Sequence, residues 1–217
     1  MINLEGPRQP PKNGEPAKAL AILLHGYGAD GNDLIGLAPV LSSQLPHVEF
    51  ISPHAPFPCE MSPFGRQWFS LGDRSADAML GGARMAAQIL DDFLNEQLEK
   101  SKLTPDRLAL IGFSQGTMMS LYTAPRRDHP IAGILGYSGR IVGANLMAAE
   151  TKSRPPVFLA HGEMDPVLPI ECLDAAQQTL EECDFSVQTL RCPNLGHSID
   201  ENGLVQGTNF LRTIFGV

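Results

Sequence analysis

The sequence predicts one α/β domain, in which helices cover both faces of a mostly parallel β-sheet. Short apolar runs alternate along the chain with segments whose apolar residues recur at helical spacing. Most of these runs lack alternation with polar residues, which is typical of strands buried on both faces. The chain of 217 residues is 43% hydrophobic and shows no internal repeat or linker. It therefore fits a single domain, 1–217, better than two, with residues 1–18 as a polar N-terminal arm.

Composition argues against several kinds of partner. The net charge is −8 and no basic cluster is denser than Arg126-Arg127, which argues against a nucleic-acid surface or a general affinity for anionic membranes. No apolar run approaches the ~20 residues that span a bilayer, and residues 1–18 lack the apolar core of a signal peptide. The four cysteines show no C-x-x-C spacing. We therefore expect a cytoplasmic protein with reduced thiols.

Strands and helices are expected to alternate from residue 19 to the end. Asn32 or Asp33 can cap a helix that runs toward Leu45, and Pro39 must start, kink or break part of it. Only residues 138–156 separate two of the later strands, which excludes a large cap domain and predicts an open site. The predicted strands are residues 19–24, 48–52, 107–111, 131–137, 157–160 and 185–190, and the other predicted helices are 75–102, 115–124, 171–182 and one within 198–215.

The segment Pro53–Asp73 is expected to form an irregular loop, because it contains four prolines. It also carries Phe64, Trp68 and Phe69. Structureless loops of about 20 residues are uncommon in compact domains and tend to be functional where they occur. Two interpretations stay open: the aromatic residues line a substrate site, or they pin the loop to the surface.

A serine turn follows one of the apolar strands. The sequence Gly112-Phe-Ser114-Gln-Gly116 closes that strand and opens a helix. At such a junction the pattern G-x-S-x-G is typical of a sharp, strained turn that exposes the serine hydroxyl at the top of the sheet. The pattern carries little weight alone, so its meaning depends on whether other loops supply a base, an acid and an oxyanion hole.

Two further loops can supply the acid and the base. Asp165 and His197 each follow a predicted strand, so both are expected beside Ser114 at the carboxyl edge of the sheet. The order Ser, Asp, His along the chain is that of α/β-hydrolases. His197 would take the serine proton and return it to the leaving group, while Asp165 would orient the imidazole. His161 is the alternative base, although its expected role is to order the turn of Asp165.

Two backbone N–H groups can form the oxyanion hole. That of Gln115 lies at the amino end of the helix that follows the serine. The second is expected from the loop His25-Gly26-Tyr27-Gly28, with Tyr27 as the donor. The sequence has no H-E-x-x-H or similar metal-ligand spacing, so neither a metal nor another cofactor is expected.

These motifs together resemble the phospholipase/carboxylesterase family of α/β-hydrolases, which includes acyl-protein thioesterases. The resemblance covers the chain from about Ala19 to the end. The matching segments are Leu24–Asp30, Pro53–Pro56, Trp68-Phe69, Gly112–Gly116, Ser120–Ala124, His161–Val167 and Gly196–Ser198.

The resemblance implies a fold, a site and a substrate class. The implied fold is the α/β-hydrolase fold without a cap domain. The implied catalytic triad and oxyanion hole are Ser114, Asp165 and His197, with the amides of Tyr27 and Gln115. The acyl chain is expected to lie against Phe64, Trp68, Phe69 and Val167.

Two positions depart from the family pattern. Thr117 stands where acyl-protein thioesterases usually have another glycine, and Ser70 stands where they usually have aspartate. Residues 138–143 also lack the aromatic residue expected in an acyl tunnel. The chain thus resembles the bacterial carboxylesterase branch more closely.

We expect a serine hydrolase that cleaves carboxylic esters of small molecules through an acyl-enzyme. Thioesterase or lysophospholipase activity is the enzymatic alternative, and capture of acyl ligands without turnover is the non-enzymatic one. A homodimer formed through the open face of the site is left undetermined.

Overall fold

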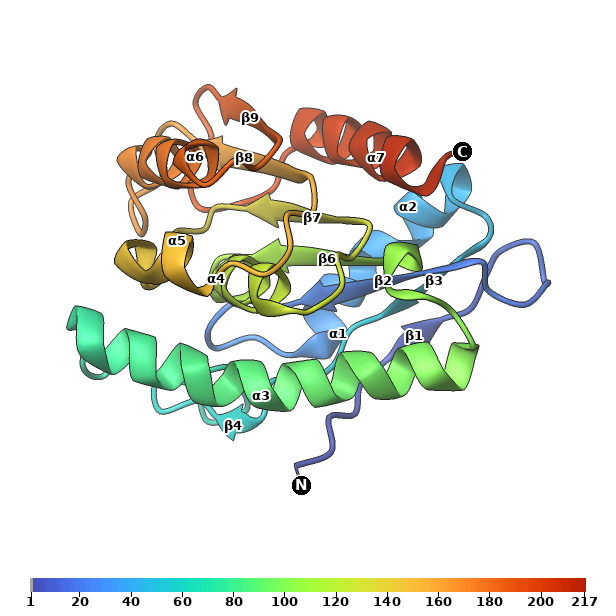
Figure 1. Ribbon diagram of the computed structural model, residues 1–217, viewed down its shortest axis with the longest axis horizontal. Helices are drawn as coiled ribbons and strands as arrows, with labels where there is room; N and C mark the ends of the chain where they lie inside the picture. The colour runs from blue at the N-terminus through green and yellow to red at the C-terminus, as the bar shows by residue number, and fades with distance from the viewer. Residues whose placement is uncertain (1) are drawn as a thin grey trace.

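The computed structural model describes residues 2–217, and its centre is a seven-stranded β-sheet (Figure 1). The strand order is β1-β3-β2-β6-β7-β8-β9. Only β1 runs antiparallel to its neighbour within this sheet of the described chain. The strands are β1 (Arg8–Gln9), β2 (Ala19–Leu24), β3 (Val48–Ile51), β6 (Leu108–Phe113), β7 (Gly133–Tyr137), β8 (Val157–Gly162) and β9 (Val187–Cys192).

Helices cover both faces of the sheet and enclose two apolar cores, which confirms the predicted architecture (Figure 1). The helices are α1 (Gly31–Leu34), α2 (Ala38–Gln44), α3 (Ala76–Ser101), α4 (Gln115–Thr123), α5 (Met147–Glu150), α6 (Glu171–Glu182) and α7 (Glu201–Phe215). Side chains of α3, α4 and α6 fill one core, and those of α2 and α7 the other. Leu20 and Ile22 belong to the first core, and Ala21 and Leu23 to the second. The apolar run of β2 is therefore buried on both faces.

The helix expected between Asn32 or Asp33 and Leu45 is divided in two. A 3₁₀ turn, Ile35–Leu37, separates α1 from α2. Asp30, rather than either predicted residue, caps the first piece, because its side chain accepts a hydrogen bond from the amide of Asn32. Proline lies in the first turn of α2, where it removes no helical hydrogen bond.

A short part of the N-terminal arm joins the sheet. Arg8 and Gln9 pair with β3, and the side chain of Leu4 is buried. The amide of Ser52 donates to the carbonyl of Pro7 at 3.0 Å, and that of His54 to the carbonyl of Glu5 at 2.8 Å. Composition could not predict this strand, because its hydrogen bonds come from the open edge of β3 rather than from local propensity.

The loop Pro53–Asp73 contains one short antiparallel pair, β4 (Phe57–Pro58) with β5 (Arg66–Gln67). The segment 138–156 holds only a 3₁₀ turn and α5, so no cap domain interrupts the sheet within residues 2–217. Over the same residues, no helix combines the length and the apolar character that a membrane crossing needs.

Candidate active site

Ser114 lies at the junction between β6 and α4 in a strained conformation. Its φ is 53° and its ψ is −114°, a region that residues other than glycine rarely occupy. Its amide donates to the carbonyl of Tyr137 at 2.9 Å, which ties the turn to β7. A Cβ atom at Gly116 would lie 1.7 Å from the carbonyl oxygen of Leu24, and one at Gly112 would lie 2.4 Å from the amide of Thr117. The two glycines of the motif are therefore required by close backbone contacts.

This packing predicts opposite effects of two glycine-to-alanine substitutions. Gly116→Ala should lower the free energy of unfolding by about 3 kcal/mol, because its methyl group would overlap backbone that cannot move away. Gly81→Ala should raise it by about 1 kcal/mol, because Gly81 lies within α3 and a Cβ there meets no atom within 4 Å. Urea unfolding of both variants and the wild type measures the difference. Equal midpoints for the two variants would contradict the assigned backbone contacts.

Asp165 and His197 form a hydrogen-bonded pair at the carboxyl edge of the sheet. His197 Nδ1 lies 2.6 Å from Asp165 Oδ2, and Oδ1 accepts from the amides of Val167 at 2.8 Å and Leu168 at 2.9 Å. Burial by itself raises the pKa of Asp165, but the amide of Leu168, the imidazole of His197 and the amide of Val167 together hold it below its usual value. The carboxylate is thus kept charged against the imidazole.

His161 is buried behind this pair. Its Nε2 lies 2.8 Å from the carbonyl of Leu168 and 3.4 Å from Asp165 Oδ2. These contacts hold the turn that contains Asp165. His161 is not among the residues that line the cavity beside Ser114, whereas His197 is.

Ser114 and His197 line one cavity of about 480 Å³, together with Tyr27, Gln115 and Val167. The ring of His197 packs against that of Phe113, with centroids 4.9 Å apart. Within the described chain, Ser114 Oγ makes no direct hydrogen bond to His197; such contacts are often long before substrate binds and shorten in the complex. The other lining residues are Leu71, Arg74, Met79, Met118, Arg140, Leu168, Pro169 and Cys172.

The loop that carries Tyr27 is held by a buried histidine. His25 Nε2 accepts from the amide of Ala55 at 3.0 Å, and His25 Nδ1 lies 2.8 Å from the carbonyl of Gly26. The indole N–H of Trp68 donates to the carbonyl of His25 at 3.1 Å. The position of Tyr27 therefore depends on contacts that are sealed from solvent.

Three of the four residues expected to contact the acyl chain lie elsewhere. Trp68 and Phe69 are 0% and 2% exposed and belong to the core, so they pin the loop rather than line the site. The side chain of Gln115 accepts from the amide of Trp68 and donates to the carbonyl of Phe69. Phe64 is 92% exposed and outside the cavity lining. Of this set, Val167 alone lines the cavity in residues 2–217.

Ser70 and Thr117, the two residues that depart from the family pattern, both form hydrogen bonds with nearby residues. Ser70 Oγ donates to the carboxylate of Glu60 at 2.9 Å, and the hydroxyl of Tyr27 donates to the same carboxylate at 3.0 Å. Thr117 Oγ1 donates to the carbonyl of Tyr137 and accepts from its amide. The methyl group of Thr117 has room because residue 139 is glycine. A Cβ at Gly139 would lie 2.3 Å from that methyl group.

Acid is expected to destabilise the loop through His25. Burial lowers the pKa of His25 below 6.5, and a proton on Nε2 would remove the acceptor for Ala55. The unfolded chain then binds this proton at higher pH than the folded chain, so the stability from neutral His25 is complete above about pH 6.5 and falls as pH drops toward the folded pKa. Between about pH 7 and 5, the urea midpoint should fall more steeply for the wild type than for His25→Gln. His129→Gln, which replaces an exposed histidine, is the control, and its urea midpoint should change with pH as steeply as that of the wild type. An equally steep change in His25→Gln would contradict this account.

The site offers no candidate metal centre. Among residues 2–217, no three His, Cys, Asp or Glu side chains are grouped so that they could hold an ion. The groups gathered at the cavity are instead a strained serine, an imidazole with a carboxylate partner, and backbone N–H groups at a helix start. These groups are suited to nucleophilic attack on an acyl carbon.

The fold is that of the α/β-hydrolases, with a serine elbow at the carboxyl edge of its sheet. A family model described as Phospholipase/Carboxylesterase matches residues 11–215. The chain belongs to this family, and it is a hydrolase of the esterase and thioesterase type.

Curated relatives and solved structures agree with this family. Acyl-protein thioesterase 1 of Kluyveromyces lactis is 29% identical over 180 residues, 77% of this chain and 78% of that protein. The crystal structure of esterase PE8 is 40% identical, covers 98% of this chain and 100% of its own, and superposes with a TM-score of 0.94. The Bacillus cereus carboxylesterase is 18% identical with a TM-score of 0.78, covering 97% of this chain and 94% of its own, and supports the fold alone.

Proposed function

We propose that this chain is a carboxylesterase in which Ser114 is the nucleophile, His197 is the general base and acid, and Asp165 is the carboxylate that orients His197. The single observation that carries the proposal is the strained, positive-φ backbone of Ser114 at the start of α4, in one cavity with a His197 that is hydrogen-bonded to Asp165. Strain of this kind persists only where the surrounding structure holds it. The relationship to an esterase and to a thioesterase supports the same reaction class.

The reaction proceeds through an acyl-enzyme. Ser114 Oγ attacks the carbonyl carbon while His197 Nε2 takes the hydroxyl proton. The tetrahedral intermediate collapses, the bond to the leaving oxygen breaks, and His197 gives that oxygen its proton. Water then attacks the acyl-enzyme, with His197 again as base, and releases the carboxylic acid. Asp165 fixes the imidazole tautomer and stabilises the imidazolium.

The backbone N–H groups of Tyr27 and Gln115 are proposed to bind the oxyanion. Gln115 begins α4, so its N–H points out of the helix start and has no intrahelical partner. The side chain of Gln115 also binds the backbone of Trp68 and Phe69, which couples the helix to the loop network that holds Tyr27. Donors held in this way need no rearrangement when charge develops.

Hydrolysis of a matched ester and thioester series tests the proposal. Oxygen esters and thioesters of the same acyl chains should both release product with repeated turnover, and the ratio of their kcat/KM values decides between carboxylesterase and thioesterase. Chain-length dependence separates short-chain ester hydrolysis from lysophospholipase activity. Stoichiometric binding of an acyl compound without product release would contradict the proposal.

A further inference from the structure

The cavity beside Ser114 combines an apolar wall with two basic groups. Leu71, Met79 and Met118 contribute to the apolar wall, which suits a hydrocarbon segment. Arg74 and Arg140 also line the cavity, and both residues are exposed to solvent. No aspartate or glutamate belongs to this lining in the part of the chain that is described.

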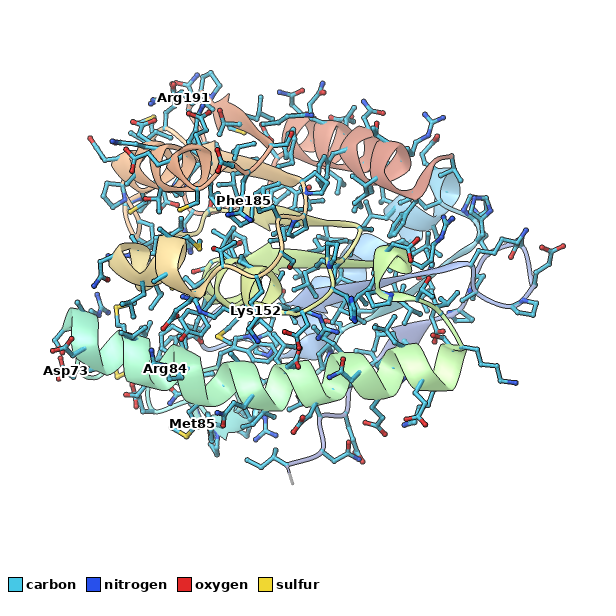
Figure 2. All side chains as sticks on the ribbon, in the orientation of Figure 1. Asp73, Arg84, Met85, Lys152, Phe185 and Arg191 are labelled. Carbon is cyan, nitrogen blue, oxygen red and sulfur yellow. The ribbon has the colours of Figure 1, made fainter. Side chains whose placement is uncertain are left out.

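Neither guanidinium is neutralised by a carboxylate. Arg74 Nε donates to the carbonyl of Leu71 at 3.4 Å, which leaves both terminal nitrogens free of partners among residues 2–217. Asp73, next to Arg74 in sequence and labelled in Figure 2, instead accepts from the amide of Ser75 at 2.8 Å. The side chain of Arg140 has neither a hydrogen bond nor an ion pair to any described residue.

Several basic side chains elsewhere in this acidic protein do form ion pairs. Figure 2 labels two of them, Arg84 on α3 and Lys152 after α5. Arg84 lies 3.1 Å from a carboxylate oxygen of Glu150, and Lys152 lies 2.9 Å from one of Asp128. Pairing of this kind leaves little capacity to bind a further anion, whereas the two arginines of the cavity keep theirs.

The positive charge of Arg140 acts on Cys172, another residue of the cavity lining. Burial raises the pKa of the Cys172 thiol, and the nearby positive charge of Arg140 opposes this rise. Asp77 and Glu171 line two separate hollows on the other sides of Arg140, but neither lies within ion-pair distance of it. The guanidinium is therefore available to a group that enters the cavity.

We propose that Arg74 and Arg140 form an anion subsite, so that the preferred substrates are esters bearing a carboxylate or phosphate group on an otherwise apolar molecule. The inference rests on the proposed function of Ser114, and it adds the substrate class. A guanidinium presents several N–H donors in a plane that matches a carboxylate or phosphate. In a chain of net charge −8, the two groups also offset the general repulsion of anions at the mouth of the site.

Two pairs of matched substrates test the subsite and distinguish the two anions. The first pair is p-nitrophenyl hydrogen adipate and p-nitrophenyl hexanoate, which differ in a terminal carboxylate on the acyl side. The second is 1-acylglycerol 3-phosphate and the 1-monoacylglycerol of the same acyl chain, which differ in a phosphate on the alcohol side. For each pair, the kcat/KM of the anionic ester is divided by that of the neutral one.

We expect this ratio to favour the anionic ester by about tenfold in at least one pair. It should fall roughly threefold in Arg74→Gln and in Arg140→Gln, and to about one in the double variant. Arg212→Gln, which removes an equal charge from the last turn of α7, should keep the wild-type ratio. About 0.5 M salt should reduce the preference, because the rim groups are exposed to solvent.

Three results would overturn the subsite: no preference in either pair, a preference that persists in the double variant, or an equal loss in Arg212→Gln. Ser114→Ala separates these from failure of the proposed function. If Ser114→Ala abolishes hydrolysis while the arginine variants keep the ratio, the subsite is wrong and the proposed function stands. Hydrolysis that persists in Ser114→Ala would overturn both.

Discussion

Replacing Ser114 with alanine is expected to lower kcat/KM for a p-nitrophenyl ester by at least about 10⁴-fold. The variant keeps His197, Asp165 and the oxyanion donors, but it has no hydroxyl to form the acyl-enzyme. The remaining rate reflects substrate binding and oxyanion stabilisation of direct attack by water. Initial rates at equal protein concentration measure the effect.

The control for this variant is Ser43→Ala. Ser43 is exposed on α2, and its hydroxyl donates only to the carbonyl of Val40 within the described chain. Its activity should match the wild type. The urea midpoint of Ser114→Ala should stay close to that of the wild type, because Ser114 Oγ makes no hydrogen bond to a described residue. Activity within about tenfold of the wild type in a folded Ser114→Ala protein would contradict the account.

Asp165→Asn is expected to lower kcat by about 10³- to 10⁴-fold. An asparagine side chain is nearly the same size, but its amide group can donate to His197 Nδ1. It would then favour the tautomer with the proton on Nε2, which cannot accept the proton of Ser114. It would also remove the negative charge that stabilises the imidazolium.

The pH dependence of the wild type follows from the same carboxylate. Because the pKa of Asp165 lies below its usual value, the carboxylate stays charged until the pH falls below about 3.9. The acidic limb of the rate profile above that pH should therefore not report Asp165.

The control for Asp165→Asn is Asp92→Asn, on α3, since Asp92 forms no ion pair with a described residue. A fully active Asp165→Asn enzyme, or an equal loss in Asp92→Asn, would contradict the assigned role.

The sequence could predict those parts of the fold whose cause is local. The sequence predicts β2 and α3 to within one residue. A strand buried on both faces is a continuous apolar run, whereas a helix buried along one side has apolar residues at helical spacing, so the two patterns are distinct. The β1 strand could not be predicted, because it forms only where β3 offers an open edge. Asp30 was missed as the cap because neighbouring Asn32 and Asp33 have the same chemistry.

The site was predictable in part for a related reason. Ser114, Asp165 and His197 follow strand ends, so topology alone brings them to one edge of the sheet. Trp68 was ambiguous, because an aromatic loop residue can face a substrate or a core, and only the contacts with His25 and Gln115 show that it packs inward. No sequence pattern around Arg140 indicates that it lines the site. The cytoplasmic location stays a prediction, and the sequence leaves the oligomeric state undetermined.

Mapping the covalent adduct of a fluorophosphonate tests the central claim most directly. Intact-protein mass spectrometry after incubation should show a single phosphonyl group per chain, and peptide analysis should place it on the hydroxyl of Ser114. The Ser114→Ala protein should remain unmodified under the same conditions. An adduct on any other residue, or equal labelling of Ser114→Ala, would contradict the assignment of Ser114 as the nucleophile.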